Sequence, residues 1–360
     1  DYPKEKLDIK FICEEIDKET QGALKQHDLP SYFDVIIVPD TIPRTKPKAC
    51  NYGLRQAKGK YVVIYDAEDI PDPKQLKIAH ALFKKDKEDK VICIQSVLTF
   101  YNTYKNYFTR SFTLEYAMWF ENFLPGLEKL KAMIPLGGTS NHFIKDKLIE
   151  IGAWDPFNVT EDADLGMRIG IHNHNTLVSA AATYEEANSK FINWVRQRSR
   201  WIKGYMQTYL VYMRHPIKFI KQVGLYKFML FQFVVGGTFL FPLCNPVLLF
   251  FSIASIINPL YYMNTFPAFI VPMCWFNLII GNGLLITTNY LISKKYRNTQ
   301  MTLSALMIPI YWFLMSFGGY FAFFELLTNP FYWQKTHHGF HLLDAIKHEQ
   351  KNKPNIEPII

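Results

Sequence analysis

The sequence contains few cysteines, and none of them stands at the spacing of a metal-binding pair. Its 360 residues include five cysteines, scattered along the chain without a C-x-x-C pair. A disulfide framework or a zinc module needs several closely spaced cysteines, so the fold rests on neither. We interpret the cysteines as small apolar residues of a protein in a reducing compartment.

Charged residues are scarce in the last third of the chain. Residues 228–327 are almost uncharged, whereas most of the Lys, Arg, Asp and Glu residues precede them. A polar part followed by an apolar part predicts a soluble domain attached to a membrane region. The sequence also lacks a homeodomain-like, zinc-finger or heptad pattern. We therefore expect the positive charges behind its net charge of +8 to bind anionic lipid or a phosphate-bearing substrate. We expect no nucleic-acid partner.

The first half alternates short β-rich runs with helical patterns. Apolar runs that alternate with helices predict parallel strands buried on both faces, an α/β class, and a functional site at the carboxyl ends of the strands. The strand-like runs are 9–13, 34–38, 61–65 and 91–95, and the helix-like runs include 48–57 and 74–85.

Two aromatic-rich segments follow. Residues 106–130 combine aromatics with scattered charge and predict an amphipathic surface helix. In residues 193–214, Trp, Tyr and Met alternate with Arg and Lys. Such a helix suits a membrane interface, where aromatics lie at headgroup depth and cations meet phosphates.

Three apolar blocks are long enough to approach or cross a membrane. Prolines interrupt the first, and the third carries Pro309 and the pair Gly318-Gly319, which predict a bent helix in the interface. The blocks cover residues 228–257, 266–292 and 301–327.

The distribution of lysines and arginines predicts the topology of these blocks. Positive residues precede the first block and follow the second, so the positive-inside rule favours two crossings, near 241–257 and 266–292. Residues 228–240 and the third block would then lie along the cytosolic face. We expect a multi-pass protein of the cell (inner) membrane whose catalytic domain and C-terminal tail are both cytosolic.

An acidic cluster follows the strand-like run 61–65. Asp66 and Glu68 stand two residues apart at the end of this run, so both side chains can converge on one divalent ion. Hard oxygen ligands suit Mg²⁺ or Mn²⁺, which would bridge a diphosphate. The alternative is a solvated acidic turn before Pro71.

Two further motifs carry chemistry. Thr160-Glu161-Asp162 can supply a general base, or it can be a helix N-cap whose carboxylates complement the dipole. In the run from Gln197 to Trp201, Arg suits a phosphate and Trp offers a flat face to a sugar ring. The alternative there is a basic amphipathic helix on lipid.

In this order, the motifs resemble those of the membrane-integrated family-2 glycosyltransferases, the group of cellulose, chitin and hyaluronan synthases. That family has a GT-A (Rossmann-like) catalytic domain with a D-x-D, a T/S-E-D and a Q-x-x-R-W. Residues 46–54 are also similar to its nucleotide-contacting stretch. The corresponding motifs here are Asp66-Ala67-Glu68, Thr160-Glu161-Asp162 and Gln197 to Trp201.

The resemblance implies an inverting sugar transfer. Mg²⁺ or Mn²⁺ held by Asp66 and Glu68 would neutralise the diphosphate of a nucleotide-sugar donor. Asp162 would take the proton of the acceptor hydroxyl. The resemblance further assigns Lys48 and Arg200 to the donor phosphates, and Glu161, Gln197 and Trp201 to the acceptor side.

Other positions follow the family pattern less closely. Glu68 replaces the usual second Asp, although its longer arm can still reach a metal. Glu15 is the candidate for the carboxylate on the nucleobase side. Trp333 and Thr336 match the gating segment of cellulose synthases, with a juxtamembrane aromatic belt as the alternative. The family's first strand should precede Asp1, so we expect an N-terminally truncated chain, and whether it is active alone stays open.

These motifs predict four regions and a leading function. The regions are a GT-A catalytic domain at 1–192, an interface helix region at 193–227, a membrane region at 228–330, and a gating-like segment with a polar tail at 331–360. The leading function is transfer of a hexose from a nucleotide-sugar, by resemblance a UDP-sugar, to a growing polysaccharide. A single-transfer glycolipid synthase is the alternative enzyme, because it needs no channel. An inactive membrane remnant or receptor is the non-enzymatic one. The expected partners are the donor, a glycan or lipid acceptor, and membrane lipid.

Overall fold

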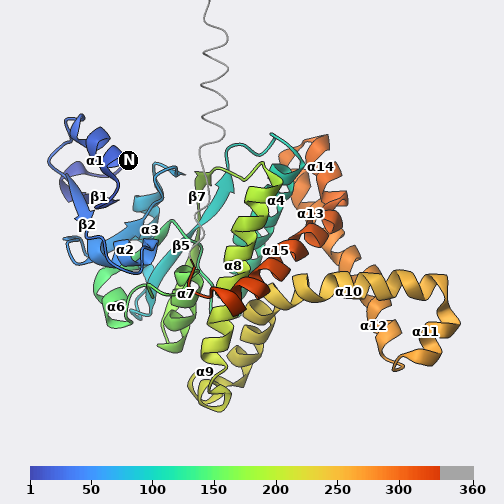
Figure 1. Ribbon diagram of the computed structural model, residues 1–360. Coiled ribbons are helices and arrows are strands. Elements are labelled where there is room, and N and C mark those ends of the chain that lie inside the picture. The colour runs from blue at the N-terminus through green and yellow to red at the C-terminus, as the bar shows by residue number, and fades with distance from the viewer. Residues whose placement is uncertain (333–360) are drawn as a thin grey trace, which may run out of the picture.

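The computed structural model describes residues 1–332, as an α/β part followed by packed helices (Figure 1). β1 (Ile9–Glu14) and β2 (Phe33–Val38) form a two-stranded parallel sheet. The larger sheet has the order β3–β6–β5–β7–β4, and all four predicted strands are confirmed. The strands of this larger sheet are β3 (Tyr61–Ile64), β4 (Ile70–Pro71), β5 (Val91–Phe100), β6 (Asn141–Ile144) and β7 (Asn175–Glu185).

The prediction of uniformly parallel strands is wrong for the larger sheet. β6 runs antiparallel to both β3 and β5, and β4 runs antiparallel to β7, whereas β5 and β7 are parallel. In the β3–β6 register, Ile64 lies opposite Asn141. This direction brings the turn at residues 137–140 to the carboxyl end of β3, where the acidic cluster begins.

The prediction that the strands are buried on both faces is also wrong for the small sheet. Ile12, Val35 and Ile37 are all exposed, although Cys13 and Val38 are buried. In sequence, the apolar runs of β1 and β2 therefore look the same as those of the strands in the larger sheet. In the structure, however, only one face of the small sheet is covered.

Short helices surround the sheets and connect their strands. The predicted helices at 48–57 and 74–85 are confirmed as α2 and α3, with slightly different ends. These helices are α1 (Lys18–Lys25), α2 (Lys46–Leu54), α3 (Gln75–Lys85), α6 (Lys145–Glu150) and α7 (Glu161–Ile171).

The segment predicted as a surface helix is buried instead. It forms α4 (Tyr107–Met118), a π-helical turn (Trp119–Phe123) and α5 (Leu124–Lys129). Phe112 and Leu114 are at most 1% exposed, because α4 lies between β5 and two C-terminal helices, α13 (Asn282–Ser293) and α14 (Thr299–Leu306).

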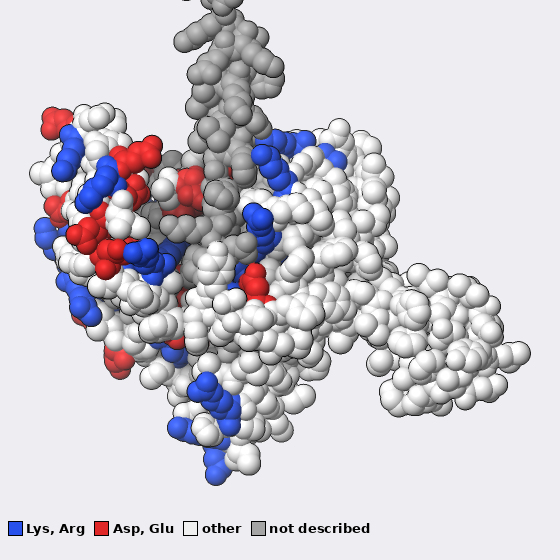
Figure 2. Space-filling view, in the orientation of Figure 1, with Lys and Arg blue, Asp and Glu red and all other residues white. Residues whose placement is uncertain are grey.

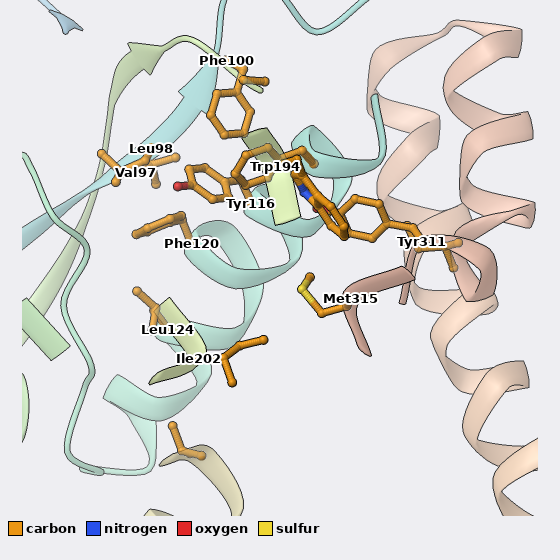
Figure 3. Close-up of a cluster of buried hydrophobic side chains, with 14 of the residues drawn as sticks. Val97, Leu98, Phe100, Tyr116, Phe120, Leu124, Trp194, Ile202, Tyr311 and Met315 are labelled. Atoms are coloured by element: carbon orange, nitrogen blue, oxygen red, sulfur yellow. The ribbon is translucent and has the colours of Figure 1, made fainter. Parts of the chain in front are cut away.

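The 193–214 helix, α8 (Phe191–Tyr212), packs inside the protein rather than lying on a membrane surface. It lies along α15 (Ile308–Thr328). Trp194 of α8 and Tyr311 of α15 are fully buried, and the indole Nε1 donates to the Tyr311 hydroxyl at 3.1 Å. Figure 3 shows these rings meeting Tyr116 of α4 in one apolar cluster. The α/β part and the apolar helices thus share a core.

Buried ion pairs strengthen this junction. The Arg198 guanidinium donates to both carboxylate oxygens of Glu115 at 2.7 Å. Lys203 Nζ lies 3.0 Å from Glu325 of α15. Both basic side chains are almost fully buried, which explains why an alternation of Arg and Trp here does not indicate lipid contact.

Within residues 1–332, three helices are long and apolar enough to cross a membrane. They cover Pro216–Ile257, Ile270–Tyr296 and Ile308–Thr328. The first joins α9 (Pro216–Phe231), a π-helical turn (Gln232–Gly236) and α10 (Gly237–Ile257). The second includes α12 (Ile270–Phe276), a π-helical turn (Asn277–Gly281) and α13, and α11 (Pro259–Thr265) precedes it.

The end of α10 projects from the body together with α11 and α12 (Figure 1). Figure 2 shows no charged residue on the visible face of this arm. Its large apolar side chains, among them Ile257 and Phe269, are strongly exposed. An apolar arm of this kind is suited to lipid. The expected number of crossings and their direction stay predictions.

The residues expected to bend these helices do not interrupt them, and the backbone leaves helical geometry at Gly224 of α9 instead. α10 continues through Pro242 and Pro246, and Pro309 occupies the first turn of α15, where its missing N–H costs nothing. A Cβ at Gly318 would lie 2.9 Å from the Cβ of Arg198, and one at Gly319 would lie 3.0 Å from that of Pro242. The glycine pair therefore permits close packing of α15 on α8 and α10.

The remaining predictions have mixed outcomes. The five cysteines are free thiols, as expected. The four-region division stays a prediction. Trp333 and Thr336 lie outside the described residues, and so does the tail.

Candidate active site

A cavity of about 860 Å³ lies between the α/β part and the apolar helices. Its wall contains the carboxyl end of β3, the 137–139 turn, the N-terminus of α7 and one face of α8. Seven predicted site residues line it: Asp66, Glu68, Glu161, Asp162, Gln197, Arg200 and Trp201. The three sequence motifs, up to 135 residues apart, therefore meet at one place.

The turn after β3 holds the first acidic cluster. The Asp66 carboxylate pairs with Lys46, whose ammonium also donates to the Gly138 carbonyl at 2.8 Å. The Asp69 carboxylate accepts from the Asp66 backbone N–H at 2.9 Å and from the Thr139 hydroxyl. Burial, and secondarily the Asp66 charge, raises the pKa of Asp69 to about 6.

The N-terminus of α7 holds the second acidic cluster. Asp162 accepts from the Ala163 N–H at 2.8 Å, and the helix dipole favours a carboxylate there. A Cβ at Gly138 would lie 3.2 Å from Asp162 Oδ2, so glycine leaves room beside this oxygen. Burial raises the pKa of both Glu161 and Asp162, and each pKa is lowered in turn by the charges of Lys46 and Arg200.

α8 supplies the third wall of the cavity. The Gln197 side-chain oxygen accepts from Asn188 at 2.9 Å. The Trp201 ring is stacked against Tyr116, with ring centroids 6.4 Å apart, and Arg198 lies over it at 4.7 Å. Trp201 is thus held by aromatic contacts on the protein side while it borders the cavity.

Among residues 1–332, the side chains that line the cavity include many more acidic than basic groups. Seven carboxylates and three cationic side chains line it, and one of those cations, Arg198, is bound to Glu115. Like charges in a confined space repel and favour a bound cation. The pKa of Glu185, a further wall residue, is also raised by its burial and by neighbouring carboxylates.

Two predicted residues lie elsewhere. Lys48 donates to the carbonyls of Pro39 and Thr41 at 3.1 and 2.9 Å. Glu15 accepts from the Asp40 N–H at 3.0 Å. Both therefore lie at the carboxyl end of the small sheet, and Lys46, two residues earlier on α2, reaches the cavity in place of Lys48.

Several wall residues were not among the predicted site residues. Lys46 and Asp69 lie within or beside the predicted motifs, so their charge there is a signal that could have found them. Glu115, Glu185 and Tyr205 have no local signal, because their place in the wall depends on long-range packing.

The cavity changes character toward the apolar helices. There its wall is formed by side chains of α10, α13, α15 and the π-helical turn that precedes α10. These side chains include Phe233, Val234, Phe241, Leu285, Trp312 and Met315. One end of the cavity is thus acidic and the other is apolar.

Comparison with known proteins identifies the family. Residues 61–324 match the description "Glycosyl transferase family group 2". The chain belongs to this family. The matched range contains all three motifs, so membership of family 2 and the GT-A type of α/β fold, followed by apolar helices, are confirmed. The assignment to the cellulose, chitin and hyaluronan synthase group stays a prediction.

Individual relatives of this family-2 glycosyltransferase are distant. It is 22% identical to the probable glycosyltransferase YdaM of Bacillus subtilis over 309 residues, covering 83% of this chain and 69% of the relative. It is 27% identical to the beta-monoglucosyldiacylglycerol synthase of Synechocystis over 207 residues, covering 53% of this chain and 40% of the relative. The structure of a Pyrobaculum calidifontis mannosyltransferase with GDP-Man and Mn²⁺ aligns with a TM-score of 0.49 at 16% identity, covering 87% of this chain and 79% of that one.

Proposed function

We propose that this family-2 glycosyltransferase transfers a hexose, with inversion, from a nucleotide-sugar to an acceptor hydroxyl at the membrane. The observation that carries the proposal is the shared cavity, in which the Asp66–Asp69 turn faces Asp162 and Arg200 while the opposite end is apolar. A UDP-hexose is the donor to test first, because the resemblance of the motifs implies a UDP-sugar.

Asp162 is the proposed general base. As the acceptor oxygen attacks the anomeric carbon, its proton passes to the Asp162 carboxylate. The bond between that carbon and the diphosphate oxygen breaks, and the nucleoside diphosphate leaves with the bonding electrons. Lys46 and Arg200 supply positive charge beside these groups, and Trp201 offers a face for the acceptor. Electrostatic stabilisation of the leaving diphosphate is an expected main source of rate.

The residues at the acidic end fit a divalent metal. Within residues 1–332 no three His, Cys, Asp or Glu side chains converge as a ready-made metal site. A magnesium-type ion nevertheless needs only one or two protein carboxylates when a substrate phosphate completes its shell. The excess of carboxylates in the wall favours such a cation. Asp66 and Glu68 would hold Mg²⁺ or Mn²⁺, which would neutralise the donor diphosphate.

Glu68→Gln is expected to weaken UDP binding in Mn²⁺ by roughly ten- to hundredfold, because an amide is a poorer ligand than a carboxylate. Isothermal titration with UDP, with Mn²⁺ or with EDTA, measures this effect. Glu150→Gln, at an exposed position on α6, is the control and should bind as the parent does. Unchanged UDP binding in both Glu68→Gln and EDTA would remove the metal from the proposal.

The acidic limb of the pH profile tests the base. Because burial raises the pKa of Asp162, kcat/KM should fall on acidification at a higher pH than an ordinary aspartate would cause. Below that pKa the protonated carboxyl cannot accept the acceptor proton. Arg200 lowers this pKa, so Arg200→Gln should move the limb upward by about one unit or more. A limb that stays in place would separate Asp162 from the proton transfer.

The acceptor distinguishes two versions of this function. A polysaccharide synthase of the cellulose, chitin or hyaluronan type needs a polar channel for its product. The apolar end of the cavity, with Phe241, Leu285 and Met315, instead favours a single transfer to a lipid. Purified protein in vesicles should release UDP from UDP-hexose and add one sugar per acceptor by mass spectrometry. Long glycan products would restore the polysaccharide version, and donor left intact by every nucleotide-sugar tested would support an inactive remnant.

The proposed location is a cell membrane with the donor side in the cytosol. Nucleotide-sugars are made there, and exposed lysines such as Lys218 and Lys221 lie on α9, where Figure 2 shows positive charge gathered. The positive-inside rule places such residues on the cytosolic side.

A further inference from the structure

A second cavity continues the first toward the outside of the apolar helices. Its volume is about 270 Å³, and it lies between α10, α13 and the π-helical turn before α13. Met118, Phe241 and Leu285 line both cavities. The two spaces are therefore separated by no more than the side chains that they share.

The outer cavity has a mainly apolar wall that also carries three polar side chains. Asn277, Asn282 and Thr288 line it, within a helix that is otherwise apolar enough to cross a membrane. The Asn282 amide donates to the Asn277 carbonyl at 3.0 Å. Polar side chains at this depth are costly unless they serve packing or a ligand. Here they stand beside an open space.

Local helix geometry marks the same path. Three π-helical turns occur in the described residues, at 119–123, 232–236 and 277–281. Residues of the first two line the inner cavity, and residues of the third line the outer one. Such single turns widen a helix and are frequent at functional sites. All three here border one continuous route.

The charge of the inner cavity restricts what can travel along this route. Seven carboxyl groups face three cations there, and two of these cations, Lys46 and Arg198, already pair with Asp66 and Glu115. The donor diphosphate adds further negative charge. A phosphate-bearing acceptor would be repelled even with one divalent ion bound. A neutral head group with a free hydroxyl meets no such barrier.

We infer that the acceptor is an uncharged hydroxyl lipid, and that its hydrocarbon chain leaves the site sideways between α10 and α13. Its hydroxyl lies at Asp162, and its chain passes Phe241 and Leu285 and then the Asn277–Asn282 wall. This inference rests on the proposed function and adds the class of acceptor and its route. A diacylglycerol or a neutral glycolipid fits this description, whereas a polyprenyl phosphate does not.

A plug in the route tests the inference. Thr288→Trp enlarges a side chain that lines the outer cavity but not the inner one. Leu291→Trp introduces the same residue on the same helix at an exposed position, 61% accessible, and serves as the matched control. The assay compares dioleoylglycerol in phosphatidylcholine vesicles with dibutyrylglycerol, whose chains are too short to need the route. UDP release without acceptor reports the intact donor site.

Thr288→Trp should lower the rate with dioleoylglycerol by about tenfold or more and leave dibutyrylglycerol transfer and UDP release unchanged. Leu291→Trp should match the parent in all three. Equal losses with both acceptors would overturn the route. Faster transfer by the parent to a polyprenyl phosphate than to dioleoylglycerol would overturn the acceptor class while sugar transfer itself stands. Should Thr288→Trp fold poorly, Leu284→Trp in the wall of the same outer cavity replaces it.

A second measurement does not depend on turnover. A diacylglycerol with a diazirine in its acyl chain, irradiated in vesicles with the full chain, should label peptides that contain Phe241 and Leu285. The label there should fall in Thr288→Trp but not in Leu291→Trp. Labelling confined to outward-facing positions such as Phe250 would overturn the route. Absence of UDP release from every donor, by contrast, would overturn the proposed function and leave this labelling result to decide lipid binding.

Discussion

Asp162→Asn is expected to lower kcat by a factor of about 10²–10⁴, the contribution of a well-placed general base, while UDP binding in Mn²⁺ stays near that of the parent. The amide cannot accept the acceptor proton, but it has almost the same size and can still accept the Ala163 N–H. Initial rates of transfer to a vesicle-bound acceptor, together with UDP titration, measure the two quantities separately.

Two controls sharpen this test. Asp146→Asn changes an exposed carboxylate on α6 and should leave the rate unaltered. Asp164, the nearby alternative base, already binds Arg168 at 2.8 Å and the Tyr212 hydroxyl at 3.1 Å, so it serves the structure. Substantial transfer by Asp162→Asn would place the base elsewhere in the cavity wall.

Glu115→Leu is expected to reduce the free energy of unfolding by about 3–5 kcal/mol, because it leaves a buried guanidinium without its counterion. The Arg198 side chain is 4% exposed, and its fork fits both Glu115 oxygens. The Tyr311 hydroxyl also donates to Glu115 at 2.6 Å. Removal of the carboxylate therefore affects α4, α8 and α15 together, and thermal unfolding in detergent measures the loss.

Two further variants distinguish the effect of the lost charge from the effect of changed packing. One also replaces the partner Arg198, and the other breaks an ion pair at the surface. Adding Arg198→Met to Glu115→Leu should recover much of the stability, since an apolar pair of similar volume often replaces a buried ion pair at little cost. Glu121→Leu breaks an ion pair with Lys295, which is 43% exposed, and should cost no more than about 1 kcal/mol. A double variant as unstable as Glu115→Leu would mean that shape, not charge, dominates at this junction.

The acidic turn after β3 and the acidic start of α7 could be predicted because their signals are local. An apolar run that ends in Asp66 and Glu68 indicates a strand end with ligands, whatever surrounds it. The order of the motifs, shared with the family, then associates these residues with Arg200 although they lie far apart in the chain. The cavity confirms that they meet, while the role of each stays a proposal.

The positions that could not be predicted depend on long-range packing. Lys46 and Lys48 lie on the same helix about 200° apart, so only the placement of α2 decides which one faces the cavity. Glu185 reaches the wall because β7 pairs with β5. Phe112 and its neighbours look amphipathic in sequence, since no local pattern tells that a second layer of helices covers the outer face of α4.

The core shared by α8 and α15 also sets an order of events during synthesis. Trp194 and Tyr311, which meet in that core, are 117 residues apart, and every apolar helix lies between them or just after. A ribosome must therefore have produced nearly all of the described chain before the cavity wall can close. Long-range contacts of this kind form late. The newly made α/β part should accordingly lack a complete cavity, so that the proposed sugar transfer begins only after the apolar helices have packed against it.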